Sequence, residues 1–115
     1  MNITIAQLDD HTTAVTIAGE MDALACNDAR PIFEQLGKSG ANHQVQLNLE
    51  QVTFLDSSGI GAIVFLFKRL KAAQGSLSIC NVYGQPRELM QLLRIDKAIT
   101  VDWGFKDHAQ ARVAS

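Results

Sequence analysis

Apolar residues recur at every second position in two short stretches near the start of the chain. Ile3 and Ile5 form the first, and Val15 and Ile17 form the second, so each predicts a strand with one apolar face. Residues 9–12 between them are polar and turn-prone. Two strands joined by a short polar turn predict an opening β-hairpin.

The apolar period changes in the middle of the chain. Residues 44–50 alternate strictly between apolar and polar side chains, which predicts a strand with one buried face. Beyond Gly59 the apolar residues recur every three or four positions, which predicts a helix that ends near Gly75. The apolar stripe of this helix contains Ile60, Ile63, Val64, Phe67 and Leu70.

Weaker signals predict the remaining elements. Asn27 or Asp28 is a suitable N-cap for an earlier helix, with Pro31 in its first turn and its end at Gly37 to Gly40. The other predicted elements are a strand at 77–79, a short helix from Pro86, an extended segment over 99–103 and a terminal helix over 105–113.

The order of these elements is β-β-α-β-α-β-α with a tail. A hairpin followed by alternating helices and strands predicts an α/β fold with a mixed sheet of four to five strands. Right-handed β-α-β crossovers would then place the helices mainly on one face.

Composition narrows the class of protein. A chain of 115 residues suits one domain, and a net charge of -2 lacks the basic face that nucleic-acid binding needs. Polar residues interrupt the first ten positions, and the longest apolar run, residues 62–67, is too short to cross a bilayer. Cys26 and Cys80 form no C-x-x-C pair, and we expect reduced thiols. We therefore expect a cytoplasmic protein without membrane insertion.

The candidate chemistry lies at the predicted strand-to-helix junction. Asp56 or Ser57 can cap the orphan N–H groups of the helix, and Ser58 places a second hydroxyl beside them. A helix N-terminus also tolerates a phosphate well. Gly59 and Gly61 leave backbone uncovered, so we expect a partner to approach closely there. The alternative is a purely structural cap.

The helix after this junction has a second face. At 100° per residue, Phe65 points away from the apolar stripe and lies beside Ala62. An outward phenylalanine framed by small residues is a candidate docking surface, although single exposed apolar residues are ordinary.

Two segments resemble a known family. Residues 54–61, Phe-Leu-Asp-Ser-Ser-Gly-Ile-Gly, resemble the signature of the STAS domain, as in bacterial anti-sigma factor antagonists. Residues 19–22, Gly-Glu-Met-Asp, resemble its earlier G-E-x-D element, and Asn48-Leu49 also fits. The resemblance covers residues 2–107 and leaves 108–115 as a tail or the end of a last helix.

The resemblance implies a function. In that family an ATP-dependent serine kinase, often the anti-sigma factor itself, phosphorylates the first Ser after the Asp, which is Ser57 here. A metal-dependent serine/threonine phosphatase reverses the modification. The unphosphorylated form binds the anti-sigma factor and releases a sigma factor. Asp22 would lie near Ser57. No cofactor is implied, and the segment 23–26 is more apolar than expected after the G-E-x-D element.

Other functions remain as alternatives. A hydrolase triad of Asp56, Ser57 and one of His11, His43 or His108 lacks a nucleophile elbow. A response-regulator receiver would not open on a hairpin. No phosphate-binding loop and no cluster of metal ligands is present in the sequence. The main alternative keeps the fold, because STAS-like domains also serve as structural subunits of membrane lipid-transport ATPase complexes.

Overall fold

In the part of the chain that the structure describes, five strands form one sheet and three helices pack on it. The computed structural model describes residues 1–38 and 40–104. The strands are β1 (Asn2–Asp9), β2 (Thr12–Met21), β3 (Gln44–Leu55), β4 (Ser76–Cys80) and β5 (Thr100–Asp102). The helices are α1 (Ala23–Gly37), α2 (Ser57–Ala72) and α3 (Gly84–Leu92), with a 3-10 turn η1 at Ile95–Lys97.

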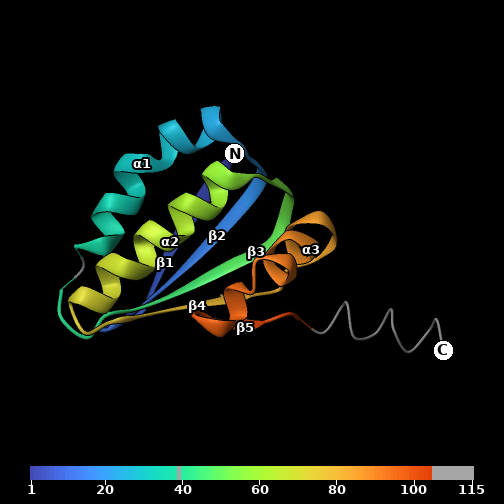
Figure 1. Ribbon diagram of the computed structural model, residues 1–115. Helices are drawn as coiled ribbons and strands as arrows, with labels where there is room; N and C mark the ends of the chain where they lie inside the picture. The colour runs from blue at the N-terminus through green and yellow to red at the C-terminus, as the bar shows by residue number, and fades with distance from the viewer. Residues whose placement is uncertain (39, 105–115) are drawn as a thin grey trace.

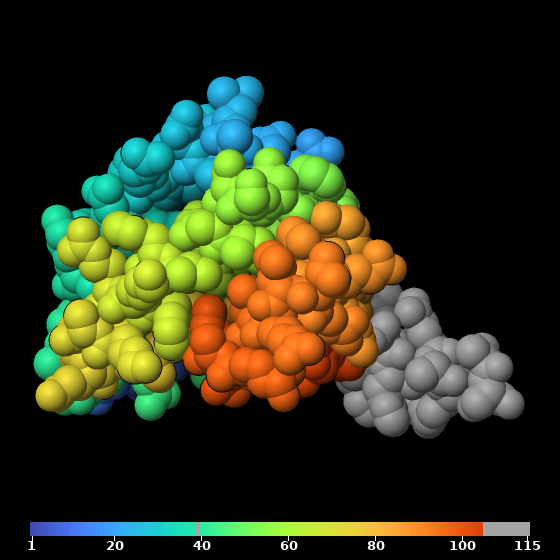
Figure 2. All heavy atoms as spheres, in the orientation of Figure 1, coloured from blue at the N-terminus to red at the C-terminus, as the bar shows by residue number. Residues whose placement is uncertain are grey.

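The strands follow one another across the sheet in chain order. β1 and β2 pair antiparallel as the predicted hairpin, and β2, β3, β4 and β5 pair parallel. The three helices lie on one side of this sheet (Figure 1) and cover most of that side in the space-filling view (Figure 2). The predicted mixed α/β fold with helices on one face is therefore confirmed.

The core lies between the sheet and the helices. Leu47 and Ile79 are buried on the inner face of neighbouring strands. Phe33 from α1, Leu66 from α2 and Met90 from α3 belong to the same buried cluster. The outward-facing positions of β2, of β3 as far as Glu50 and of β4 are small or polar, which is the alternation expected of a sheet with one solvated face.

Strand β3 is longer than the alternating segment that predicted it. Its pairing with β2 shifts register twice, so buried residues become three apart at Leu49, Val52 and Leu55. An extra residue in one strand turns the following side chains to the other face. This is why Phe54 is exposed although it lies within an apolar run.

The predicted start of the first helix was wrong. α1 begins at Ala23, and its N-cap is Asp22 rather than Asn27 or Asp28. Pro31 therefore lies in the helix interior, where it removes one backbone hydrogen bond. The sequence predicted no element over residues 22–26. Asp22 is the N-cap of α1, and the apolar residues after it form the first turn of the helix.

The later elements agree more closely with the sequence. β4 contains residues 77–79, β5 falls within 99–103, and α3 begins two residues before Pro86. The helix predicted over 105–113 lies outside the described residues, as does the predicted tail.

Candidate functional site

Two strand-to-helix junctions meet at one edge of the sheet. β2 and β3 are parallel neighbours whose last residues, Met21 and Leu55, pair with each other. Each strand is followed by an aspartate and then by a helix, so Asp22 and Asp56 occupy equivalent positions beside each other. This pairing brings Asp22 next to Asp56, the residue before Ser57, and the proximity of Asp22 to Ser57 stays a prediction.

Both aspartates cap their helices. Oδ1 of Asp56 accepts hydrogen bonds from the backbone N–H groups of Ser58 at 2.9 Å and Gly59 at 3.1 Å. Oδ1 of Asp22 accepts one from the N–H of Ala25 at 2.9 Å. The carboxylates also lie where the positive end of each helix dipole favours negative charge.

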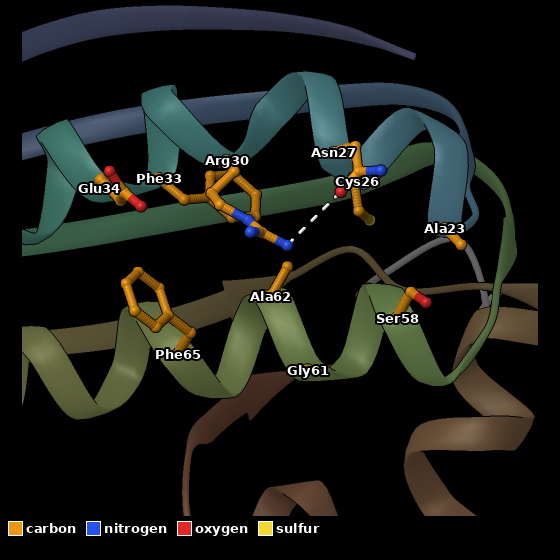
Figure 3. A pocket seen from close by; sticks show the side chains of 10 residues that line it. All are labelled: Ala23, Cys26, Asn27, Arg30, Phe33, Glu34, Ser58, Gly61, Ala62 and Phe65. Atoms are coloured by element: carbon orange, nitrogen blue, oxygen red, sulfur yellow. Dashed lines mark hydrogen bonds between the residues drawn. The ribbon is translucent and has the colours of Figure 1, made fainter.

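The two serines after Asp56 differ in their surroundings. Ser57, the first residue of α2, is exposed. Ser58 is half-buried and faces a groove between α1 and α2 (Figure 3). Ser57 is therefore the more accessible of the two serines.

The groove has a volume of about 510 Å³ and lies beside both junctions. The α2 wall includes Ser58, Gly61, Ala62 and Phe65, and the α1 wall includes Ala23, Cys26, Asn27, Arg30, Phe33 and Glu34 (Figure 3). Nη2 of Arg30 donates to Oδ1 of Asn27 at 3.5 Å. Phe65, which is half-buried, lies with its ring centroid 5.0 Å from the guanidinium carbon of Arg69.

The two glycines of the signature serve different purposes. Gly59 is buried, and a Cβ there would lie 2.7 Å from the carbonyl oxygen of Met21. Gly59 therefore allows α2 to pack closely on the end of β2, and the expectation that it exposes backbone to a partner was wrong. Gly61 is exposed, has open space where a Cβ would point, and lines the groove.

Gln85 of α3, which the sequence analysis did not single out, stabilises the β3–α2 junction. Its Oε1 accepts from the N–H of Leu55 and its Nε2 donates to the carbonyl of Leu55, both at 2.8 Å. β4 pairs with β3 only as far as Asn48, so this side chain takes the place of a neighbouring strand. No local sequence pattern indicates such a long-range contact.

A second hollow of about 330 Å³ adjoins the β2–α1 junction. It is lined by Met1, Glu20, Asp22, Leu24, Ala25 and Asp28. Leu24 is 76% exposed and was not among the predicted site residues. The one sequence signal that pointed to Leu24 was the apolar character of residues 23–26.

The pKa of the Cys26 thiol is raised by its surroundings, which include an aspartate from each junction. Burial raises its pKa most, and the negative charges of Asp56 and then Asp22 raise it further. Cys26 is therefore a neutral thiol on the groove wall near pH 7.

The histidines do not complete a catalytic triad within the described residues. His43 is buried and its Nε2 lies 2.7 Å from Oγ1 of Thr13, and His11 is in the β1–β2 turn. Both histidines lie near the start of β3, whereas Ser57 follows the end of this strand. At ~3.3 Å per residue, the length of β3 separates the histidines from Ser57 by roughly 35 Å. Residue 108 lies outside the described part of the chain.

The fold and this edge of the sheet define a small domain with an exposed hydroxyl beside a groove. The sequence model of the STAS domain matches residues 2–111, and the chain belongs to this family. Across residues 1–38 and 40–104, no helix has the length and apolar character needed to cross a bilayer.

Named relatives and solved structures agree with this assignment. The chain is 32% identical over 83 residues to the anti-sigma-B factor antagonist of Bacillus subtilis, covering 71% of this chain and 74% of that one. The unphosphorylated anti-sigma factor antagonist SpoIIAA has a similar structure, with a TM-score of 0.70, 22% identity and 99% of both chains covered. The phosphorylated form of the Bacillus protein SpoIIAA gives a TM-score of 0.69 at 22% identity, with 97% of this chain and 99% of that one covered.

Proposed function

We propose that this protein is an anti-sigma factor antagonist whose binding is switched by phosphorylation of Ser57. The exposed position of Ser57 at the start of α2, beside the groove, is the observation that carries the proposal. The unphosphorylated protein binds an anti-sigma factor and thereby releases a sigma factor in the cytoplasm. An ATP-dependent serine kinase, which can be the anti-sigma factor itself, adds the phosphate, and a metal-dependent serine/threonine phosphatase removes it.

Electrostatics supports a switch at this position. A phosphate adds about -1.5 to -2 charge, and the N-terminus of α2 tolerates this charge in the free domain. In a complex the dianion must be desolvated beside Asp56, with Asp22 on the adjoining junction. A loss of about 2.8 kcal/mol lowers affinity about 100-fold, because 1.4 kcal/mol corresponds to tenfold.

The groove supplies the docking surface for the anti-sigma factor in this proposal. Gly61 leaves room on the α2 wall, and Ala62 and Phe65 continue that wall as small and aromatic surface. Ser58 faces the same groove. A side chain of the partner that enters here would bury the exposed part of Phe65, which is the type of residue that anchors interfaces.

The first experiment measures phosphate transfer and binding. The anti-sigma factor of the same organism that phosphorylates this protein with ATP is purified, and the modified residue is located by mass spectrometry. We expect phosphate on Ser57, constitutive binding by Ser57→Ala and about 100-fold weaker binding by Ser57→Asp. Ser58→Ala serves as the neighbouring-hydroxyl control and retains phosphorylation.

Three outcomes would contradict this proposal. Phosphate only on Ser58, or no transfer at all, removes Ser57 as the switch. Equal affinity of Ser57→Asp and the unmodified protein removes phosphorylation as the regulator. Constitutive binding to a membrane-transport ATPase would instead identify a structural docking subunit.

A further inference from the structure

An exposed leucine stands beside the proposed switch. Leu24 lies in the first turn of α1 and is 76% exposed, whereas the side chains that hold α1 to the core are Ala29, Phe33 and Leu36. Leu24 therefore contributes little to the packing of α1. Ala23 before it lines the groove, and Leu24 itself lines the second hollow, so it sits between the two depressions.

The surface around Leu24 is negatively charged. Glu20, Asp22 and Asp28 line the same hollow, and Asp56 caps the adjoining helix. Among the described residues that line this hollow, none has a cationic side chain. Three carboxylates therefore give the surface around this apolar side chain a negative charge at neutral pH.

We propose that Leu24 is an apolar anchor for the anti-sigma factor, and that this partner presents an apolar pocket rimmed by lysine or arginine. The inference rests on the proposed function, because it assigns the partner contact of the same edge of the sheet. An apolar side chain enclosed by charges of one sign fits a partner surface with the opposite charge around a hydrophobic centre. A second copy of this chain would bring like charges together and is disfavoured.

The anchor and the carboxylates act on different rate constants. Long-range attraction between the carboxylates and a cationic partner raises the association rate and weakens as salt increases. Burial of Leu24 in the complex lowers the dissociation rate. A phosphate on Ser57 carries the same sign as the carboxylates, so it does not slow association with a cationic partner. Its effect on affinity therefore appears as faster dissociation.

The chain offers a matched control for the anchor. Leu92 on α3 is 77% exposed, nearly the same as Leu24, but lines neither depression. Leu24→Ala and Leu92→Ala remove the same atoms from equally exposed positions. A difference in binding between the two variants therefore reports location rather than loss of surface hydrophobicity.

The experiment measures association and dissociation rates with the purified anti-sigma factor that phosphorylates Ser57. We expect Leu24→Ala to weaken binding about 10- to 100-fold through faster dissociation, because burying a leucine is worth about 1.5–3 kcal/mol. We expect Leu92→Ala to stay within about twofold, since an exposed side chain outside the interface contributes almost nothing. Circular dichroism melting confirms that both variants fold.

Charge is tested with a second matched pair. Glu20→Gln with Asp28→Asn should slow association at 50 mM salt, on the order of several-fold, and lose the effect at 500 mM. Glu88→Gln with Asp96→Asn removes the same charge from exposed positions on α3 and η1 and should change association less.

Failure of this inference is distinguishable from failure of the proposed function. Equal affinities for Leu24→Ala and Leu92→Ala overturn the anchor, and association that is insensitive to salt overturns the cationic partner surface. If Ser57→Asp still loses binding in that case, the switch stands without the anchor. If sedimentation shows a dimer that Leu24→Ala dissociates, Leu24 serves self-association and the inference fails.

Discussion

The β2–α1 and β3–α2 junctions share one backbone design and carry different side chains after the cap. In both, a buried strand residue, Met21 or Leu55, precedes an aspartate that caps the next helix. The first helix then continues with Ala23 and Leu24, and the second with two serines. One junction thus presents apolar surface, and the other presents two hydroxyl groups, the first of which is the proposed phosphorylation site.

The comparison separates folding from function within one motif. The aspartate caps recur because each helix start leaves orphan N–H groups that need an acceptor. The residues immediately after the caps make few contacts with the core, since Ala23, Leu24 and Ser57 are all exposed. These positions are therefore free to differ, and the proposed binding and switching roles fall on them.

The largest expected difference between the junctions concerns the third residue after each cap. This residue is Gly59 in α2 and Ala25 in α1. We expect Gly59→Ala to lower the free energy of unfolding by about 3 kcal/mol, because the new Cβ would overlap β2. Urea unfolding measures the loss.

Gly61→Ala is the matched control for Gly59→Ala. Its Cβ has open space, so the helix should gain about 0.5–1 kcal/mol while the groove becomes shallower. Equal stability of the two alanine variants would show that the close approach of α2 to Met21 is not maintained in solution.

Removal of the two N-caps should change the free energy of unfolding by less than Gly59→Ala does. Asp56 accepts two backbone hydrogen bonds and Asp22 accepts one. We expect Asp56→Ala to cost about 2 kcal/mol and Asp22→Ala about 1 kcal/mol of unfolding free energy, within the usual range for N-caps. Thermal or urea unfolding of both variants checks the order, and a larger loss for Asp22→Ala would contradict it.

The smallest expected effect is a change in the pKa of the Cys26 thiol when the charge of either capping aspartate is removed. In a Cys80→Ala background, Asp56→Asn should lower the pKa of the Cys26 thiol more than Asp22→Asn does, because Asp56 raises it more. Iodoacetamide alkylation at pH 8 should accelerate by less than about tenfold, since partly exposed charge pairs contribute below ~1 kcal/mol. Asparagine retains the capping oxygen.

Phosphorylation of Ser57 acts in the opposite direction on the same thiol. The added negative charge should raise the pKa of Cys26 further and slow its alkylation. An alkylation rate that is the same in phosphorylated and unphosphorylated protein would show that the phosphate points away from the groove.

The sequence predicted the fold because its periodic signals are local. Alternation over residues 44–50 and the helical stripe beyond Gly59 reflect burial on one face, and both elements were found where expected. The start of α1 was missed because Asn27, Asp28 and Pro31 together resemble a helix beginning. Asp22 makes the cap instead, and the tertiary packing of Ala29, Phe33 and Leu36 tolerates Pro31 within the helix.

The site was predictable in part. Ser57, Asp56 and Asp22 became candidates because short motifs carry them, and parallel pairing of β2 with β3 brings the two aspartate caps side by side. The buried position of Gly59 could not be found, because it depends on the distance between α2 and the end of β2. Leu24 left only a compositional signal, which acquires meaning once its exposure and its charged neighbours are known.

The contact between Gln85 and Leu55 links the position of α3 to the backbone just before α2. The last residue of β3 is held on its open flank by one side chain from α3 rather than by a continuous ladder of backbone hydrogen bonds. The main chain one residue ahead of the Asp56 cap therefore depends on α3 as well as on β3 itself. A shift of α3 away from β3 would remove both hydrogen bonds between Gln85 and Leu55.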